Sequence, residues 1–224
     1  MAYRRTERVI RRQAERHDAI VAAAGEAASE GGMAAIQIAP VAARAGIAAG
    51  TVYRYFPSKT ELVGALLASA ADREAAAVRR AAAAAPGPLS ALAAGIATFA
   101  ARALRDRRLA WALIAEPADA DTEAMRLDYR RALAAQFEAL VAAAVAGGHL
   151  PEVDAAQAVP ALLGSLIEGL VGPLAPDLAG DAAKAREAVQ ALTLFALRGL
   201  GVVDARARGL VVQVAIPAGD GRAA

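Results

Sequence analysis

Apolar residues recur at spacings of three and four along most of this chain, which is the period of an α-helix with one buried face. Residues 9–30 show it well, with Ile10, Ala14, Val21 and Ala28 on one stripe. Glycine, proline and aspartate separate successive stretches of this kind. The predicted helices cover residues 9–30, 39–45, 49–56, 59–85, 89–104, 109–115, 121–146, 155–171 and 181–200. We therefore expect an all-α fold of about nine helices.

The end of the chain departs from this pattern. The segment Leu210–Pro217, LVVQVAIP, has the β-branched residues typical of a strand. A lone strand has no pairing partner in a helical protein. We therefore expect residues 203–224 to form a C-terminal tail that is either disordered or in an edge contact. Pro160 lies inside the pattern at 155–171 and predicts a kink or a later start of that helix.

Two short predicted helices, 39–45 and 49–56, are separated only by a turn at Gly46. Helices of about two turns are not stable alone, so both are expected to pack on the helix at 9–30. Ser58 and Glu61 then have the spacing of a capping box, which opens the next helix. A short helix, a turn and a second short helix form the layout of a helix-turn-helix, whose second helix enters the major groove of DNA.

The second short helix has one face for the core and others for a partner. Val52 and Phe56 are four residues apart and are expected to point inward, whereas Thr51, Arg54 and Tyr55 lie on other faces. Tyrosine and lysine side chains reach phosphates, and arginine can pair with guanine in the groove. The alternative is that this aromatic cluster only packs the core.

At these positions the chain resembles the tetracycline-repressor (TetR) family of bacterial transcriptional regulators. The signature of that family is approximately I-A-x-x-A-G-V-S-x-G-T-Φ-Y-x-Y-F-x-S-K-x-x-L, with Φ aliphatic. Residues 41–62 of this chain are VAARAGIAAGTVYRYFPSKTEL. The resemblance covers residues 10–65. Beyond them it extends only to the length and helical content of the family's ligand-binding and dimerisation domain.

The resemblance implies a set of DNA-contacting residues at the start and middle of the second short helix and just after it. They are Ala49, Gly50, Thr51, Tyr53, Arg54, Tyr55 and Lys59. Arg54 would read base edges, and the two tyrosines and Lys59 would contact phosphates. A solvated Lys59 is the alternative. Ala48 departs from the family, which often has a capping serine or threonine there, and the loss of such a cap costs about 1 kcal/mol.

The distribution of charge fits a DNA-binding N-terminal part. Residues 1–60 contain nine Lys or Arg and five Asp or Glu, an excess of four positive charges, whereas the rest of the chain has two more acidic than basic residues. Phosphate neutralisation requires such an excess. The arginines near the N-terminus form either a basic arm, residues 1–9, that follows the DNA backbone or a solvated helix face.

The helices predicted at 155–171 and 181–200 are apolar on more than one side, which suggests a seam between two copies of the chain. The resemblance implies the same: these helices would form a four-helix bundle across a two-fold axis. The predicted interface residues are Leu163, Leu166, Leu170, Leu192 and Phe195. The alternative is that both helices pack only within one protomer.

Abundant alanine in the middle helices leaves room for a ligand cavity, and such cavities are mostly apolar with a few polar groups. The candidate pocket residues are Phe99, Arg102, Trp111, Ile114, Met125, Tyr129, Phe137 and Glu168, with Arg102 or Arg130 as a counter-charge. For each of these residues, an ordinary place in the core or on the surface is the alternative.

Three segments result: a three-helix DNA-binding domain at 1–60, a larger helical ligand-binding and dimerisation domain at 61–202, and the tail. The predicted function is that of a ligand-responsive homodimeric transcriptional regulator. It is expected to be a repressor that a small apolar ligand releases from a palindromic operator in double-stranded DNA. The alternative is a helical scaffold or a non-specific binder of anionic surfaces.

Other classes of protein are disfavoured. The chain has no cysteine, which excludes disulfides and thiol chemistry, and its two histidines, His17 and His149, lie far apart. A P-loop, GxGxxG and GxSxG are all missing, so the sequence argues against an enzyme. We predict no cofactor, no metal site and no membrane partner. Without an export signal or an apolar run long enough to span a bilayer, the protein is expected to be cytoplasmic.

Overall fold

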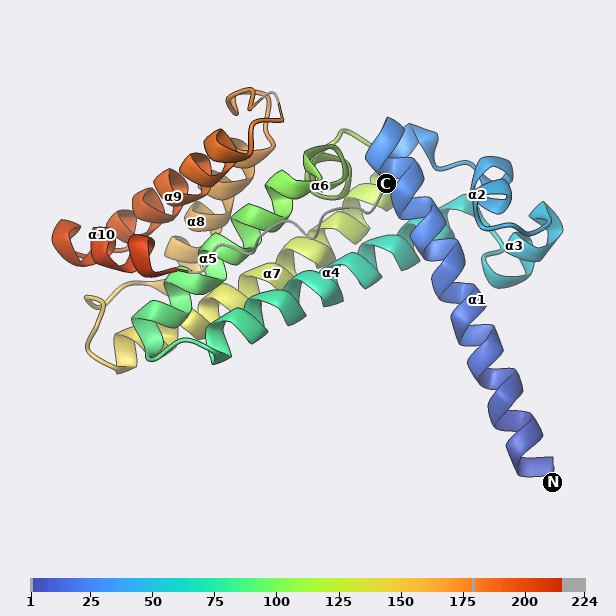
Figure 1. Ribbon diagram of the computed structural model, residues 1–224, viewed down its shortest axis with the longest axis horizontal. Helices are drawn as coiled ribbons and strands as arrows, with labels where there is room; N and C mark the ends of the chain where they lie inside the picture. Colours follow the sequence, from blue (N-terminus) through green and yellow to red (C-terminus); the bar gives the residue numbers. More distant parts are fainter. Residues whose placement is uncertain (1, 179, 215–224) are drawn as a thin grey trace.

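The computed structural model describes residues 2–178 and 180–214, with side chains from residue 7 onward. The described residues form ten α-helices and one 3-10 helix and contain no strand, so the expected all-α fold is confirmed (Figure 1). The elements are α1 (Ala2–Gly31), η1 (Met33–Ala35), α2 (Ile38–Arg44), α3 (Ala49–Tyr55), α4 (Lys59–Ala83), α5 (Pro88–Arg105), α6 (Arg107–Ile114), α7 (Ala120–Ala146), α8 (Ala155–Leu170), α9 (Ala182–Gly199) and α10 (Asp204–Gln213).

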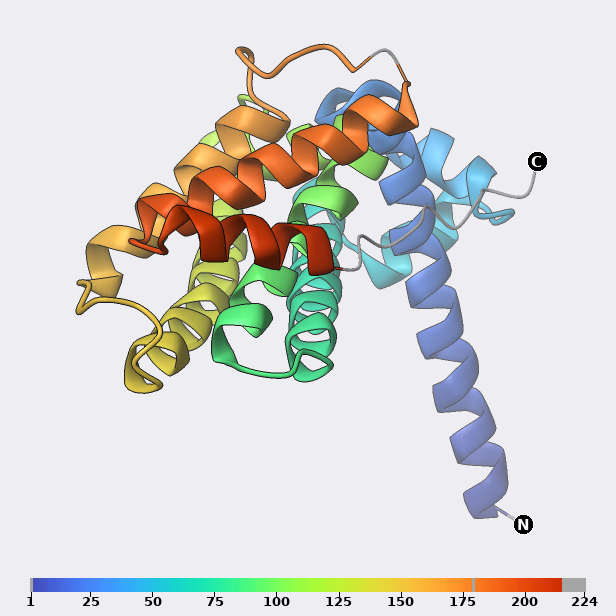
Figure 2. The ribbon, with the colours of Figure 1, turned by 60° about the vertical axis from the view of Figure 1, so that its left-hand side comes forward.

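The helices form two connected groups. At one end α2 packs on both α1 and α3, and α1 packs on α4, as expected for a helix-turn-helix (Figure 1). In the body α4, α5 and α7 pack on one another, α8 and α9 cover them, and α10 lies against α9 and α5. Figure 1 and Figure 2 both show the N-terminal half of α1 extending beyond the other helices. The predicted arm therefore continues the helix from residue 2.

One continuous core joins the two groups through α4. Leu62 and Leu66, near the start of α4, are fully buried beside Ile20 and Ala24 of α1, and Val78 near its end is buried in the body. Burial of large apolar side chains is the main stabilising contribution here, at about 1.5–3 kcal/mol for each. Because α4 belongs to both groups, it can transmit a displacement from one to the other. Among the described residues no helix is long and apolar enough to cross a membrane.

Aspartate side chains fix the starts of the helices in the body. Asp106, Asp119, Asp154 and Asp181 precede α6, α7, α8 and α9, and each accepts a hydrogen bond from a backbone N–H in the first turn, at 2.9–3.1 Å. Such caps satisfy N–H groups that have no partner within the helix. The N–H and hydroxyl of Thr122, which both donate to Asp119, hold the pKa of that carboxyl below its ordinary value.

The strand-like interpretation of Leu210–Pro217 is wrong where the structure describes it. Asp204–Gln213 form α10, and Ala207 and Val211, four residues apart, are buried against the body. Packing has overridden the strand propensity of the valines. The remaining residues of the predicted tail, 215–224, lie outside the described part. Pro160 does not mark a later start, because α8 begins at Ala155 and continues through it.

Candidate nucleic-acid interface and ligand cavity

The turn between α2 and α3 is set by Gly46. Its φ is +67°, a conformation that only glycine adopts without strain. The N–H of the next residue, Ile47, donates to the Ala42 carbonyl of α2 at 3.0 Å and so closes the end of that helix. Helix α3 starts after Ala48, which has no side-chain oxygen, and the Thr51 N–H donates to the Ala48 carbonyl at 2.8 Å. The first turn of α3 is therefore held by backbone alone, as the missing capping residue predicts.

The buried face of α3 is the one that the sequence predicts. Val52 is fully buried and Phe56 is 4% exposed. The Phe56 ring packs on His17 of α1, with ring centroids 4.9 Å apart and the planes tilted by 41°. This contact of His17 was not predicted from the sequence. Together these contacts fix the orientation of α3 relative to α1.

The predicted DNA contacts lie together on the outer side of α3 and at the start of α4. Tyr53 is 52% exposed, and Arg54, Gly50 and Lys59 are exposed too. Ala49, Thr51 and Tyr55 are half-buried. Tyr55 also packs partly against the core. Core packing, the alternative for this aromatic cluster, therefore describes one part of what Tyr55 does.

A groove lies between α1 and the α2–α3 unit, with a volume of about 990 Å³. Its walls include Arg12 and Arg16 from the projecting part of α1 and Arg54 from α3, with Glu15 on the same wall as the first two. Within the described part of the chain, none of these three arginines makes an ion pair or a side-chain hydrogen bond. Arg11, which does not line the groove, lies 3.6 Å from Glu15.

Arg44 shows the opposite behaviour. Its guanidinium donates to both carboxylate oxygens of Glu30, at 2.8 and 2.6 Å, and approaches Glu26. The bond to Glu30 raises the pKa of Arg44 further above its ordinary value. Arg44 therefore fastens α2 to α1 and is not a free cation for DNA.

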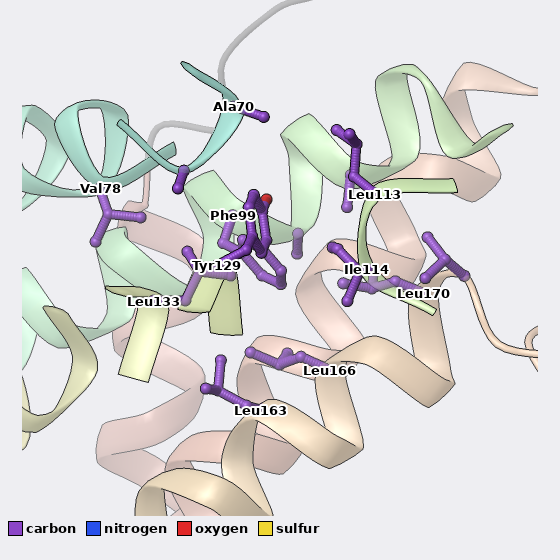
Figure 3. Packing of buried hydrophobic residues seen from close by; sticks show 14 of the residues in the cluster. Ala70, Val78, Phe99, Leu113, Ile114, Tyr129, Leu133, Leu163, Leu166 and Leu170 are labelled. Atoms are coloured by element: carbon purple, nitrogen blue, oxygen red, sulfur yellow. The ribbon is translucent and has the colours of Figure 1, made fainter. Parts of the chain in front are cut away.

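The body contains a cavity of about 220 Å³ lined by residues of α4, α5, α6 and α7 and by Asp106. Four predicted pocket residues line it: Phe99, Arg102, Ile114 and Tyr129. In Figure 3 the rings of Phe99 and Tyr129 lie at the centre of the buried cluster, with Leu113 and Ile114 on one side. The structure thus brings half of the predicted set together.

The other four predicted pocket residues lie elsewhere. Met125 lines a neighbouring cavity of about 300 Å³, to which Tyr129 also contributes. Phe137 packs edge-on against Phe99, with centroids 6.2 Å apart, and supports the wall from behind. Trp111 is half-buried on α6. Glu168 is exposed and accepts a hydrogen bond from the Leu174 N–H at 3.1 Å, so it caps a loop.

Glu74 is a cavity residue that the sequence did not single out. Arg102 donates to both of its carboxylate oxygens through Nε and Nη2, at 2.7–3.0 Å, and both side chains are largely buried. The bond to Glu74 raises the pKa of Arg102 above its ordinary value. The Tyr129 side chain is beside this pair and only 3% exposed, and its burial raises the pKa of the phenol strongly.

Arginines also close the C-terminal end of α6. Arg126 is 1% exposed and donates to the Ala112 carbonyl at 2.7 Å, to the Glu116 carbonyl and to the Glu123 carboxylate. Arg130, predicted as a counter-charge for a ligand, instead donates to the Ile114 carbonyl at 2.6 Å. Both side chains satisfy carbonyls that the end of the helix leaves without partners.

Helix α6 connects the cavity to the end of α1. Asp106, which caps α6 and lines the cavity, accepts a hydrogen bond from the Ser29 hydroxyl at 2.5 Å. Glu116, just beyond α6, accepts one from the Met33 N–H at 2.9 Å. Gly32 sits between them with φ +71°, and a Cβ there would collide with the Arg108 and Glu116 side chains. Only glycine fits this junction.

The predicted dimer residues fall into two groups. Leu163, Leu166 and Leu170 are at most 6% exposed within one protomer, so they pack in its own core. Leu192 is half-buried and Phe195 is 60% exposed on α9. Phe195 therefore remains available to a second copy.

Residues 20–66 match the family model described as "Bacterial regulatory proteins, tetR family". Over 61 residues the chain is 48% identical to the HTH-type transcriptional repressor KstR of Rhodococcus jostii (strain RHA1), covering 27% of this chain and 29% of that protein. It is 50% identical over 62 residues to KstR of Mycobacterium tuberculosis (strain ATCC 25618 / H37Rv), covering 28% and 26%. The matched segment spans less than a third of each of these relatives.

Solved structures resemble most of the chain in fold. RolR in complex with resorcinol has a TM-score of 0.66 at 20% identity, over 93% of this chain and 98% of that one. FadR from Bacillus halodurans has a TM-score of 0.71 at 20% identity, over 84% and 97%. A transcriptional regulator of the TetR/AcrR family from Thermobifida fusca YX-ER1 has a TM-score of 0.63 at 26% identity, over 83% and 98%.

Proposed function

We propose that this chain, which belongs to the tetR family of bacterial regulatory proteins, is a dimeric transcriptional repressor that a small molecule releases from its operator. The observation that carries the proposal is the α2–Gly46–α3 unit, because Tyr53, Arg54 and Lys59 are exposed together on its outer side. The similarity to the KstR repressors over the same segment supports it. A protein with this role acts in the bacterial cytoplasm.

In this proposal α3 enters the major groove and α1 follows the flanking phosphates. Arg54 reaches base edges, and Tyr53 and Lys59 contact the backbone on either side. Arg12 and Arg16 line the groove beside α3, which supports a contact between them and the phosphate strand that leaves the major groove. Their lack of ion pairs within the described residues leaves both guanidiniums free for phosphate oxygens.

Arg12→Gln is expected to weaken binding to every DNA sequence by the same factor, because phosphate contacts carry no sequence information. The slope of log K against log salt is negative, and its magnitude should decrease by about 0.9 for each phosphate contact removed. Arg11→Gln is the matched control, since Arg11 is one residue away, does not line the groove and pairs with Glu15. Fluorescence anisotropy across a salt series measures both slopes. Equal slopes for the two variants would contradict the contact.

Release by a ligand follows from the position of α6. This helix forms one wall of the cavity, and the residues that flank it, Asp106 and Glu116, accept hydrogen bonds from Ser29 of α1 and Met33 of η1. A ligand that fits the cavity better with α6 displaced would shift α1 and tilt the attached reading unit. Two readers must match the spacing of two half-sites at once, so a small tilt is sufficient to lower operator affinity.

The dimer in this proposal forms through the outer faces of α8 and α9. Phe195→Glu is expected to produce monomers, because it places a charge in the middle of an apolar contact between copies. Leu127→Glu is the control, since Leu127 is 47% exposed but belongs to a different helix, α7. Sedimentation velocity at a fixed protein concentration distinguishes the two species. A dimer that survives Phe195→Glu, or that Leu127→Glu disrupts, would contradict this interface.

Selection from randomised duplexes, followed by anisotropy, tests the whole proposal. The enriched site should be a palindrome, because a two-fold protein presents the same helix to both half-sites. At about physiological salt, the protein should prefer this site to a scrambled duplex by a hundredfold or more. No enrichment, with equal weak binding to all duplexes, would instead support a non-specific binder of anionic surfaces.

A further inference from the structure

We propose that the cavity lined by α4, α5, α6 and α7 binds an uncharged, single-ring ligand whose hydroxyl group accepts a hydrogen bond from Tyr129 and donates one to Glu74. The proposal rests on the function proposed above, because it names the chemical class of the molecule that releases the DNA. It is carried by the size of the cavity, the unpartnered Tyr129 hydroxyl and the charge already present on its walls.

The size of the cavity favours a ligand with one ring inside it. Its volume is about 220 Å³. An apolar cavity of about 150 Å³ is large enough to hold benzene, so this one has room for a ring with one or two small substituents. Phe99 is 2% exposed, and Leu113 and Ile114 complete an apolar wall around the same space (Figure 3). A flat apolar body fits such a wall.

The Tyr129 hydroxyl is the polar group that needs a partner. Tyr129 is 3% exposed and lines the cavity, and no described residue forms a hydrogen bond with its hydroxyl. A hydroxyl on a cavity wall that makes no hydrogen bond within the protein can donate to a ligand that supplies an acceptor. Burial and the nearby Glu74 carboxylate raise the pKa of the phenol, which therefore remains an O–H donor at physiological pH.

The charges on the cavity wall favour a neutral ligand. Arg102 is already neutralised by Glu74 through hydrogen bonds of 2.7–3.0 Å, so it is not available to a second carboxylate. An anionic ligand beside the largely buried Glu74 would be repelled by it. Arg73 and Arg105 also line the cavity, but both are exposed and remain hydrated, and Asp106 lies next to Arg105.

A hydroxyl group on the ligand can form hydrogen bonds with both Tyr129 and Glu74 at once. It accepts one hydrogen bond from the Tyr129 O–H and donates one to Glu74, whose carboxylate oxygens have lone pairs beyond those that Arg102 uses. A carbonyl could only accept, and an ammonium could only donate. The arrangement therefore selects a phenol or a cyclic alcohol over an acid, an amine or a hydrocarbon of the same size.

Isothermal titration calorimetry of the full chain without DNA tests this choice with three toluenes that differ only in the group opposite the methyl. They are 4-methylphenol, 1,4-dimethylbenzene and 4-methylbenzoate. We expect 4-methylphenol to bind at one site per chain, about tenfold more tightly than the hydrocarbon, and the benzoate to be the weakest. Tyr129→Phe should lower the affinity for 4-methylphenol about tenfold and leave that for the hydrocarbon unchanged. The variant loses no hydrogen bond of the folded protein, so it is expected to fold.

Other results would overturn the proposal. Tighter binding of the benzoate would indicate an acidic ligand. Equal affinity for the phenol and the hydrocarbon would mean that Tyr129 does not distinguish ligands with a hydroxyl group from those without one. No binding of any of the three would identify the cavity as a packing void. DNA binding is measured separately, so specific operator binding without 4-methylphenol binding contradicts only this inference. Binding of 4-methylphenol without specific DNA binding contradicts only the proposed function.

Discussion

Arg54→Ala is expected to remove most of the preference of this protein for its operator while retaining its weak affinity for any DNA. Arg54 is exposed on α3 and, within the described part of the chain, has no carboxylate partner to release before it binds. A bidentate contact between arginine and guanine contributes about 1–3 kcal/mol of discrimination in each half-site. A two-fold dimer loses this contribution twice.

The start of α3 explains why one arginine should matter so much. Ala48, Ala49 and Gly50 have no polar side-chain atoms, so Thr51 is the only side chain in the first turn that can hydrogen-bond to a base. Specificity must therefore come from Thr51 and from Arg54, one turn later. The helix is held in place by Val52 and Phe56, which Arg54→Ala does not touch.

Anisotropy with the selected operator and a scrambled duplex measures the effect. The ratio of the two affinities should fall towards one for Arg54→Ala. Lys59→Ala is the comparison, because loss of a phosphate contact lowers both affinities equally and keeps their ratio. An unchanged ratio in Arg54→Ala would show that other groups read the bases.

The helix boundaries between residues 38 and 199 could be predicted to within two residues because local chemistry sets them. Gly46 adopts a positive φ at the end of α2, and the Ser58 hydroxyl accepts from the Glu61 N–H at 3.1 Å at the start of α4. Both effects act over four residues and are readable in one sequence. The face that α3 buries was predicted for the same reason, since Val52 and Phe56 define it within a single turn.

The cavity and the dimer face could be predicted only in part, because they depend on contacts between distant segments. The pairing of Glu74 with Arg102 joins two helices, and no spacing in the sequence reveals it. Helix α8 is apolar on more than one side, so its periodicity could not show that Leu163 and Leu166 are buried in the core of their own protomer. Helix α10 formed against α9 despite the strand propensity of its valines.

Arg126→Met is expected to lower the free energy of unfolding by about 3 kcal/mol. The methionine fills much of the space of the arginine stem but leaves the carbonyl oxygens of Ala112 and Glu116 without their donor, and a buried acceptor left unpaired costs about 1–3 kcal/mol. Arg131→Met is the control, because Arg131 is 69% exposed and its pair with Asp128 is solvated. A change within about 0.5 kcal/mol is expected there.

Urea unfolding at a fixed protein concentration, followed by circular dichroism, compares the two variants. A dimer requires the fixed concentration, because its apparent stability depends on it. Arg126 also holds Glu116 in the position from which it accepts the Met33 N–H, so the variant should loosen the link between α6 and α1 as well. A ligand should therefore weaken DNA binding by folded Arg126→Met less than it weakens DNA binding by Arg131→Met. Equal stability and equal ligand response in both variants would mean that Arg126 neither closes α6 nor couples it to the DNA-reading unit.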